Sequence, residues 1–96
     1  MSNSTTDYTI EKFLITDQPV MESAVDVLQI LNKINKITIK GKGESCPATV
    51  SVANIIVQNM LDGKTKTDDI SVDSEILEDG RLISTIEIVI TKINNQ

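Results

Sequence analysis

The chain has 96 residues, 40% of them apolar, and a formal net charge of −5 at pH 7. This length suits one domain with a single small core, and the abundance of isoleucine, valine and leucine favours a packed fold over disorder. No run of about 18 apolar residues is present, which excludes a transmembrane helix. The N-terminus is polar without an apolar signal core, and the chain has one cysteine. We therefore expect a cytoplasmic protein in a reducing compartment.

Charge is unevenly distributed along the chain. Residues 1–32 carry one lysine and five acidic residues, residues 33–66 carry six lysines and two acidic residues, and residues 67–96 carry two cations and seven acidic residues. The basic middle could form a local positive surface on an acidic protein. A solvated surface of mixed charge explains the same distribution, so charge alone leaves both interpretations open.

The first half of the chain predicts a tail, a strand and a helix. Residues 1–7 read as a disordered tail and residues 8–96 as one domain, which begins with a strand over residues 8–15. Apolar residues then recur at helical spacing from Val20 to Ile34. Pro19 suits the first turn of this helix, and Asp17 or Gln18 stands where a cap is expected.

A short strand, a glycine-lysine loop and a second helix follow. The strand covers residues 36–40, and Pro47 opens a helix that runs to about Leu61, before a stop at residues 62–63. No residue from Pro47 to Leu61 is charged. An exposed helix face normally carries ions, so we expect a partner subunit to cover this helix.

The last third predicts a long β-hairpin. Two β-rich segments flank Asp79-Gly80, a dipeptide suited to a tight turn, and Ile86, Ile88 and Ile90 share one side of the final strand. The long arms suggest a hairpin that projects from the body. The predicted fold is an α+β two-layer sandwich of order β-α-β-α-β-β, with a four-stranded sheet and both helices on one face.

Catalytic chemistry finds little support in the sequence. The chain has no histidine, which removes the commonest general base and metal ligand. A lone cysteine with no histidine nearby usually acts as a small apolar side chain that fills space, and we expect this role for Cys46. The acidic residues lack the spacing of a calcium loop, and "GKGESC" lacks the lysine-hydroxyl pair of a nucleotide triphosphate loop. We expect no enzyme, no metal and no cofactor.

The stretch "IKGKGESCPAT", residues 39–49, is the best candidate for a binding site. Lysines alternate with glycines in a segment that opens a helix, and flexible backbone, cationic side chains and a helix N-terminus all favour phosphate. Glu44 lies within the same segment and opposes an anion.

Three separated segments resemble the Alba family of archaeal DNA/RNA-binding proteins. They are "FLITDQPVMESAVDVLQILN", "ITIKGKGESCPATVSVANII" and "EDGRLISTIEIVITK". The resemblance implies a fold similar to the C-terminal domain of bacterial translation initiation factor three. It also implies a homodimer built around the second helix and the last strands, and binding of duplex DNA or RNA with little sequence preference.

The sequence departs from the family pattern at several cationic positions. Asp17 and Gln18 stand where relatives usually have a lysine pair, and Glu44 replaces the second basic residue of the loop. Asp17 and Glu44 each fall at a predicted helix N-terminus, where a carboxylate occupies the position that a phosphate would need. We therefore expect weaker, more salt-sensitive binding than in basic family members.

Two functional hypotheses remain open. The first is an Alba-like dimer that binds duplex DNA or RNA in a chromatin or RNA-associated role, at the nucleoid if the resemblance holds. The second is an Alba-like interaction subunit that has largely lost nucleic-acid binding and pairs with a basic relative. In the first, lysine and arginine side chains contact phosphates and two glycines let the backbone approach. These residues are Lys33, Lys36, Lys40, Gly41, Lys42, Gly43 and Arg81.

Overall fold

The structure, a computed structural model, describes residues 11–93. The predicted tail and the start of the predicted first strand lie outside the described residues. The elements in chain order are β1 (Glu11–Leu14), α1 (Val20–Leu31), β2 (Lys36–Lys42), the 3-10 turn η2 (Gly43–Ser45), α2 (Cys46–Ile55), the π-helical turn η3 (Ile56–Met60), β3 (Thr65–Ile76) and β4 (Leu82–Lys92).

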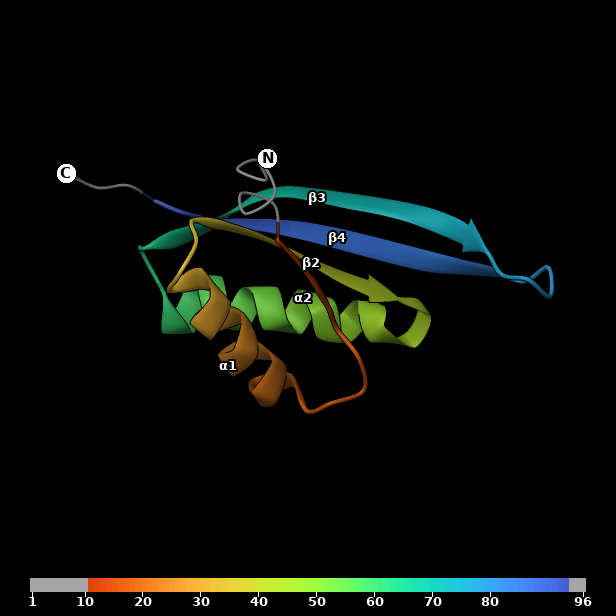
Figure 1. Cartoon of the computed structure of the whole chain (residues 1–96), viewed down its shortest axis with the longest axis horizontal. Coiled ribbons are helices and arrows are strands. Elements are labelled where there is room, and N and C mark those ends of the chain that lie inside the picture. Colours follow the sequence, from red (N-terminus) through yellow and green to blue (C-terminus); the bar gives the residue numbers. More distant parts are fainter. Residues whose placement is uncertain (1–10, 94–96) are drawn as a thin grey trace, which may run out of the picture.

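The strands form one mixed sheet of order β1-β2-β4-β3. Strand β1 is parallel to β2, whereas the β2–β4 and β3–β4 pairs are antiparallel. Both helices lie on one face of the sheet, and no helix of the described residues covers the other face, which we call the open face (Figure 1). The predicted α+β sandwich of order β-α-β-α-β-β is thus confirmed.

The core lies between the helices and the inward side of β2 and β4. Alternate residues of these strands point inward, because a strand has a side-chain period of two. The predicted inward set of β4 is confirmed for Ile88 and Ile90, which are buried, and for Ile86, which packs against them. The remaining fully buried apolar side chains come from β2 and from the inward faces of the two helices: Ile37, Ile39, Ala24, Val27, Leu31, Val52 and Ile56.

Helix boundaries differ from the sequence expectations at two places. The cap residue of α1 is Pro19, and no side chain caps the helix, so the predicted cap at Asp17 or Gln18 was wrong. The Gln18 Nε2 instead donates to Asp26 Oδ2 at 3.1 Å. The second helix begins at Cys46, and its last turn is π-helical, closed by the Leu61 N–H on the Ile56 carbonyl at 2.8 Å.

Strand β2 continues two residues further than predicted and includes Gly41. Gly41 is buried under α2, where a Cβ atom would overlap Thr49 Oγ1 and lie 2.8 Å from the Ser45 carbonyl oxygen. Thr49 Oγ1 also donates to that carbonyl at 2.8 Å. The absence of a side chain at Gly41 therefore lets the start of α2 approach the strand closely.

The β3–β4 hairpin extends beyond the helices as a long arm (Figure 1). Its turn spans five residues, 77–81, and is longer than a two-residue turn. The Leu77 N–H donates to the Arg81 carbonyl at 2.8 Å, and the Gly80 N–H donates to the Leu77 carbonyl at 2.9 Å. Gly80 has a φ of +88°, which a glycine adopts readily. The β3–β4 register shifts between Thr67 and Asp69, which marks a β-bulge.

We predict that Gly41→Ala lowers the free energy of unfolding by about 1–3 kcal/mol, because the added methyl group must displace α2. Denaturant unfolding followed by circular dichroism measures the change. Gly43→Asn serves as control, since nothing lies within 4 Å of a Cβ at Gly43 and asparagine tolerates its left-handed backbone. A loss at Gly41 no larger than at Gly43 would contradict the close approach.

Candidate nucleic-acid interface

The two lysines of the predicted glycine loop lie on a strand. Lys40 and Lys42 belong to β2, and their side chains project from the open face, while Ile39 and Gly41 face the helices. The lysine-glycine alternation is therefore the two-residue period of a strand. The loop begins only at Gly43, in η2, so the predicted strand was right for Lys40, and placing Lys42 in the loop was wrong.

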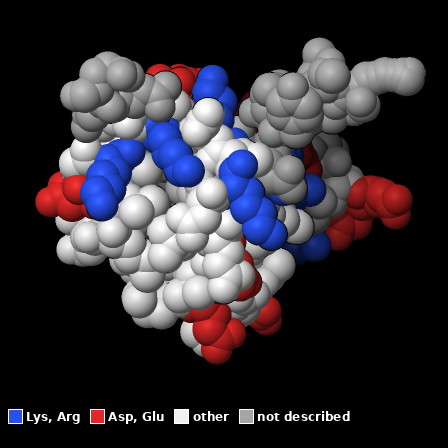
Figure 2. Space-filling view, turned by 60° about the vertical axis from the view of Figure 1, so that its left-hand side comes forward, with Lys and Arg blue, Asp and Glu red and all other residues white. Residues whose placement is uncertain are grey.

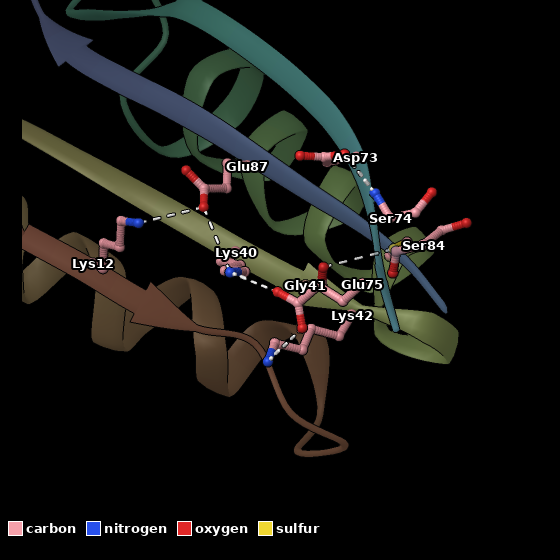
Figure 3. Close-up of polar contacts among 10 residues, drawn as sticks. Lys12, Lys40, Gly41, Lys42, Asp73, Ser74, Glu75, Ser84 and Glu87 are labelled. Atoms are coloured by element: carbon pink, nitrogen blue, oxygen red, sulfur yellow. Dashed lines mark hydrogen bonds and ion pairs between the residues drawn. The ribbon is translucent and has the colours of Figure 1, made fainter. Parts of the chain in front are cut away.

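A carboxylate from the arm lies between these two lysines. Glu75 of β3 accepts from Lys40 Nζ at 3.4 Å through Oε2, and its Oε1 is 3.2 Å from Lys42 Nζ (Figure 3). Strand β4 separates β2 from β3 in the sheet, so the Glu75 side chain reaches across β4 to make these contacts. The pair of lysines thus already holds one anionic group.

A second carboxylate extends the ion pairs to the edge of the sheet. Glu87 of β4 lies directly opposite Lys40 in the register, and its Oε2 is 3.6 Å from Lys40 Nζ and 3.3 Å from Lys12 Nζ. The ion pairs therefore run from β1 through Glu87, Lys40 and Glu75 to Lys42 (Figure 3). All four strands contribute to this network on the open face.

The network changes the acidity of one group. Hydrogen bonding to Lys42, and then to Lys40, lowers the pKa of Glu75 from its ordinary value of 4.5. Nearby cations stabilise the ionised carboxylate, so Glu75 stays charged to a lower pH than an isolated glutamate does. Sequence reasoning missed Glu75, because it is more than thirty residues from the lysines and only the strand register brings the groups together.

The other predicted site residues are spread over the molecule. Gly43 lies in η2 with a φ of +53°. Arg81 lies at the arm turn, where its Nε donates to Asp79 Oδ2 at 2.8 Å. Lys33 follows α1, and Lys36 begins β2, with its Nζ 3.9 Å from Asp68 Oδ2. The structure brings Lys40 and Lys42 together, but it places Lys36 and Arg81 at different ends of the sheet.

The two carboxylates expected at helix N-termini lie just outside the first turns of α1 and α2. Asp17 precedes the α1 cap by two residues, and the acidic residue of that first turn is Glu22. Glu44 lies in η2, one residue before the α2 cap Ser45. The predicted helix-terminal position was therefore wrong by two residues for Asp17, whereas Glu44 lies in the first turn of η2, which leads directly into α2. The Ile15 N–H donates to the Lys40 carbonyl at 2.8 Å, so the segment containing Asp17 leaves the sheet beside Lys40.

Residues 11–93 contain neither a cluster suited to a metal ion nor a helix suited to a membrane. No group of three or more histidine, cysteine, aspartate or glutamate side chains there is arranged to hold a metal ion. No helix in that range has the length and apolar character needed to cross a membrane. The half-buried Cys46 thiol is 3.6 Å from the Ser84 carbonyl oxygen and 3.7 Å from that of Gly41, so it packs between the helix and the sheet.

We predict a pH-dependent contribution of Glu75 to stability. Its folded-state pKa is below the ordinary value, so its contribution is present above the unfolded pKa and disappears as the pH falls through the lowered folded pKa. Between about pH 6 and pH 3 the free energy of unfolding should therefore decrease less in Glu75→Gln than in wild type. In an NMR titration, Lys40→Ala with Lys42→Ala should return the Glu75 midpoint toward its ordinary value; an unchanged midpoint would contradict the assigned cause.

Comparison with known proteins agrees with the fold. The model of the Alba family matches residues 11–74. The DNA/RNA-binding protein Alba of Nanoarchaeum equitans is 34% identical over 71 residues, which is 69% of this chain and 79% of the relative.

Solved structures show the same architecture. Alba from Thermoplasma volcanium superimposes with a TM-score of 0.73 at 29% identity, over 84% of this chain and 99% of that one. The crystal structure of Alba1 from Trypanosoma brucei also gives a TM-score of 0.73, over 88% of this chain and 70% of that one, and at 14% identity it shows the shared fold alone. The family model and the relative confirm the resemblance found in the sequence: the chain belongs to the Alba family.

Proposed function

We propose that this protein is a dimer that binds the phosphate backbone of duplex DNA or RNA with little sequence preference, in a chromatin or RNA-associated role and without catalysis. The observation that carries the proposal is the family match, which includes the whole of β2 and its outward lysines. The relative named as a DNA/RNA-binding protein supports the same ligand class. Lysine contacts to phosphate are independent of base sequence, in agreement with the proposed lack of preference.

In this proposal Lys40 and Lys42 are the central phosphate contacts, and Gly43, Lys33, Lys36 and Arg81 are secondary ones. A phosphate must replace the Glu75 carboxylate between the two lysines. Part of the electrostatic gain is then spent on separating existing ion pairs and hydrating the released carboxylate. Binding should therefore be weaker than in a basic family member and be lost at lower salt concentration.

The proposed dimer surface includes the outer face of α2. Val50, Ser51, Asn54 and Gln58 are exposed in the single chain, and no residue of the helix is charged. A helix that faces water permanently usually carries ions on its outer side. A neutral exposed face is more compatible with burial against another subunit.

The arm supplies a second, apolar part of the same surface. Four apolar residues of β3 and β4 on the helix-facing side of the sheet are exposed. Such an extended apolar side on an edge strand is typical of an interaction surface. Their exposed fractions range from 56% to 74%, and they are Ile70, Val72, Ile76 and Leu82. Together with α2, this side of the arm favours a dimer built around the second helix and the last strands.

A second candidate function is an interaction subunit that pairs with a basic relative. The observation that favours it is the internal neutralisation of the open face, where Lys12, Lys40 and Lys42 all pair with carboxylates of the same chain. A heterodimer would then bind nucleic acid mainly through the lysines of the relative. A purified homodimer that fails to shift duplex DNA or RNA even at low salt would favour this second function.

We predict that replacing Lys40 and Lys42 by alanine weakens binding to all duplex sequences alike. Titrations at several salt concentrations should show a log–log slope that is shallower by up to about 0.9 for each lost contact on duplex DNA. Circular dichroism serves as the control for folding. An unchanged slope in a folded variant would show that these lysines are not phosphate contacts.

We predict that Asn54→Lys dissociates the dimer. Asn54 is exposed in the single chain, so the monomer should tolerate lysine, whereas an unpaired charge buried between subunits costs several kcal/mol. Light scattering at micromolar concentration compares the variant with wild type. Gln29→Lys, at an exposed position of α1, makes the same charge change away from the proposed interface and should stay dimeric. A monomeric wild type would contradict the dimer.

A further inference from the structure

Five lysines gather at the end of the sheet opposite the arm. The α1–β2 connection, the start of β3 and the end of β4 meet there, on the left in Figure 1. The Lys92 N–H donates to the Asn35 carbonyl at 2.8 Å, and the Ile93 N–H donates to the Lys64 carbonyl at 2.9 Å. Backbone hydrogen bonds thus hold the three segments together. We call the lysines of this region the terminal lysine cluster: Lys33, Lys36, Lys64, Lys66 and Lys92.

The sheet register places two of these lysines in one row. Lys36 of β2 and Lys66 of β3 both pair with Thr91 of β4, so the three residues lie side by side on the open face. The other three lysines come from the connections and from the end of β4. Figure 2, which turns this end of the molecule forward, shows several basic side chains beside one another.

The cluster differs from the Lys40–Lys42 pair in its ion pairing. Among residues 11–93, Lys36 is the one cluster member with an ion pair, to Asp68 at 3.9 Å. The segments that form the cluster carry three carboxylates, Asp62, Asp68 and Asp69, against five lysines. Lys33, Lys64 and Lys66 are exposed. Their ammonium groups can therefore contact an external anion without first leaving an internal carboxylate.

We propose that the terminal lysine cluster is a second phosphate-binding surface, which contacts the backbone of the same class of duplex and rests on the proposed function. Lys36 and Lys42 are six residues apart on β2, which corresponds to about 20 Å at about 3.3 Å per residue. Lys40 is four residues from Lys36, or about 13 Å, so the cluster lies beyond the two central lysines and joins the secondary contacts Lys33 and Lys36 to Lys64, Lys66 and Lys92. Four of its five lysines have no ion pair within residues 11–93. Phosphate can therefore bind them and release counterions without first breaking an internal ion pair.

Salt-dependent titration of duplex DNA tests the cluster. Lys64→Gln and Lys66→Gln are made singly and together, and each keeps the side chain polar while removing one charge. We expect the log–log salt slope of the double variant to be shallower by up to about 1.8, at about 0.9 for each lost contact. Lys12→Gln is the matched control. It removes the same charge from a lysine of β1 that belongs to neither the cluster nor the Lys40–Lys42 pair, so its slope should stay close to that of wild type.

The outcomes separate this inference from the proposed function. If wild type binds duplex and the double variant keeps the wild-type slope, the cluster is not a phosphate site, while the proposed function stands. A change in Lys12→Gln equal to that of each single cluster variant would likewise overturn the cluster, because the effect would then reflect net charge alone. A wild-type homodimer that binds no duplex at low salt would overturn the proposed function and this inference together.

Discussion

The close contact between α2 and β2 at Gly41 is the interaction on which the rest of the structure depends. Ile37, Ile39 and Gly41 face the helices, and the small size of the last residue lets the start of α2 lie against the strand. Because side chains alternate along a strand, the same packing directs Lys40 and Lys42 to the open face. One strand therefore fixes both the core and the position of the central lysines.

The charged network on the open face reconciles an acidic chain with a family of nucleic-acid-binding proteins. Its members lie at the surface, and ion pairs between exposed groups contribute little to stability. Such pairs can exchange partners without loss of the fold. Glu75 and Glu87 therefore act as internal counterions of the lysines, and they reduce the attraction of the open face for polyanions without altering the sandwich. Among the described residues, four of the five lysines at the other end of the sheet have no such internal counterion.

The sequence predicted the elements and their order well, because each depends on local patterns. Helical spacing revealed α1, and the alternation of Ile86, Ile88 and Ile90 gave the inward side of β4. The end of β2 was misplaced, because Gly41, a residue type that usually marks a loop, here serves helix packing. Glu75 could not be assigned to the site, since its contacts depend on the order and register of strands far apart in the chain.

The β-bulge in β3 determines which side of the arm is apolar. Before it, Thr65 and Thr67 pair with inward-facing residues of β4, so odd-numbered positions of β3 face the helices. After the extra residue Asp68, Ile70 pairs with Ile88, and even-numbered positions face that way. Because one residue reverses the parity of a strand, loss of the bulge, with Asp68 paired regularly to Val89 and each later residue shifted by one partner, would exchange the two sides of the arm. Glu75 would then leave the lysines, and the apolar side of β3 would turn to the open face.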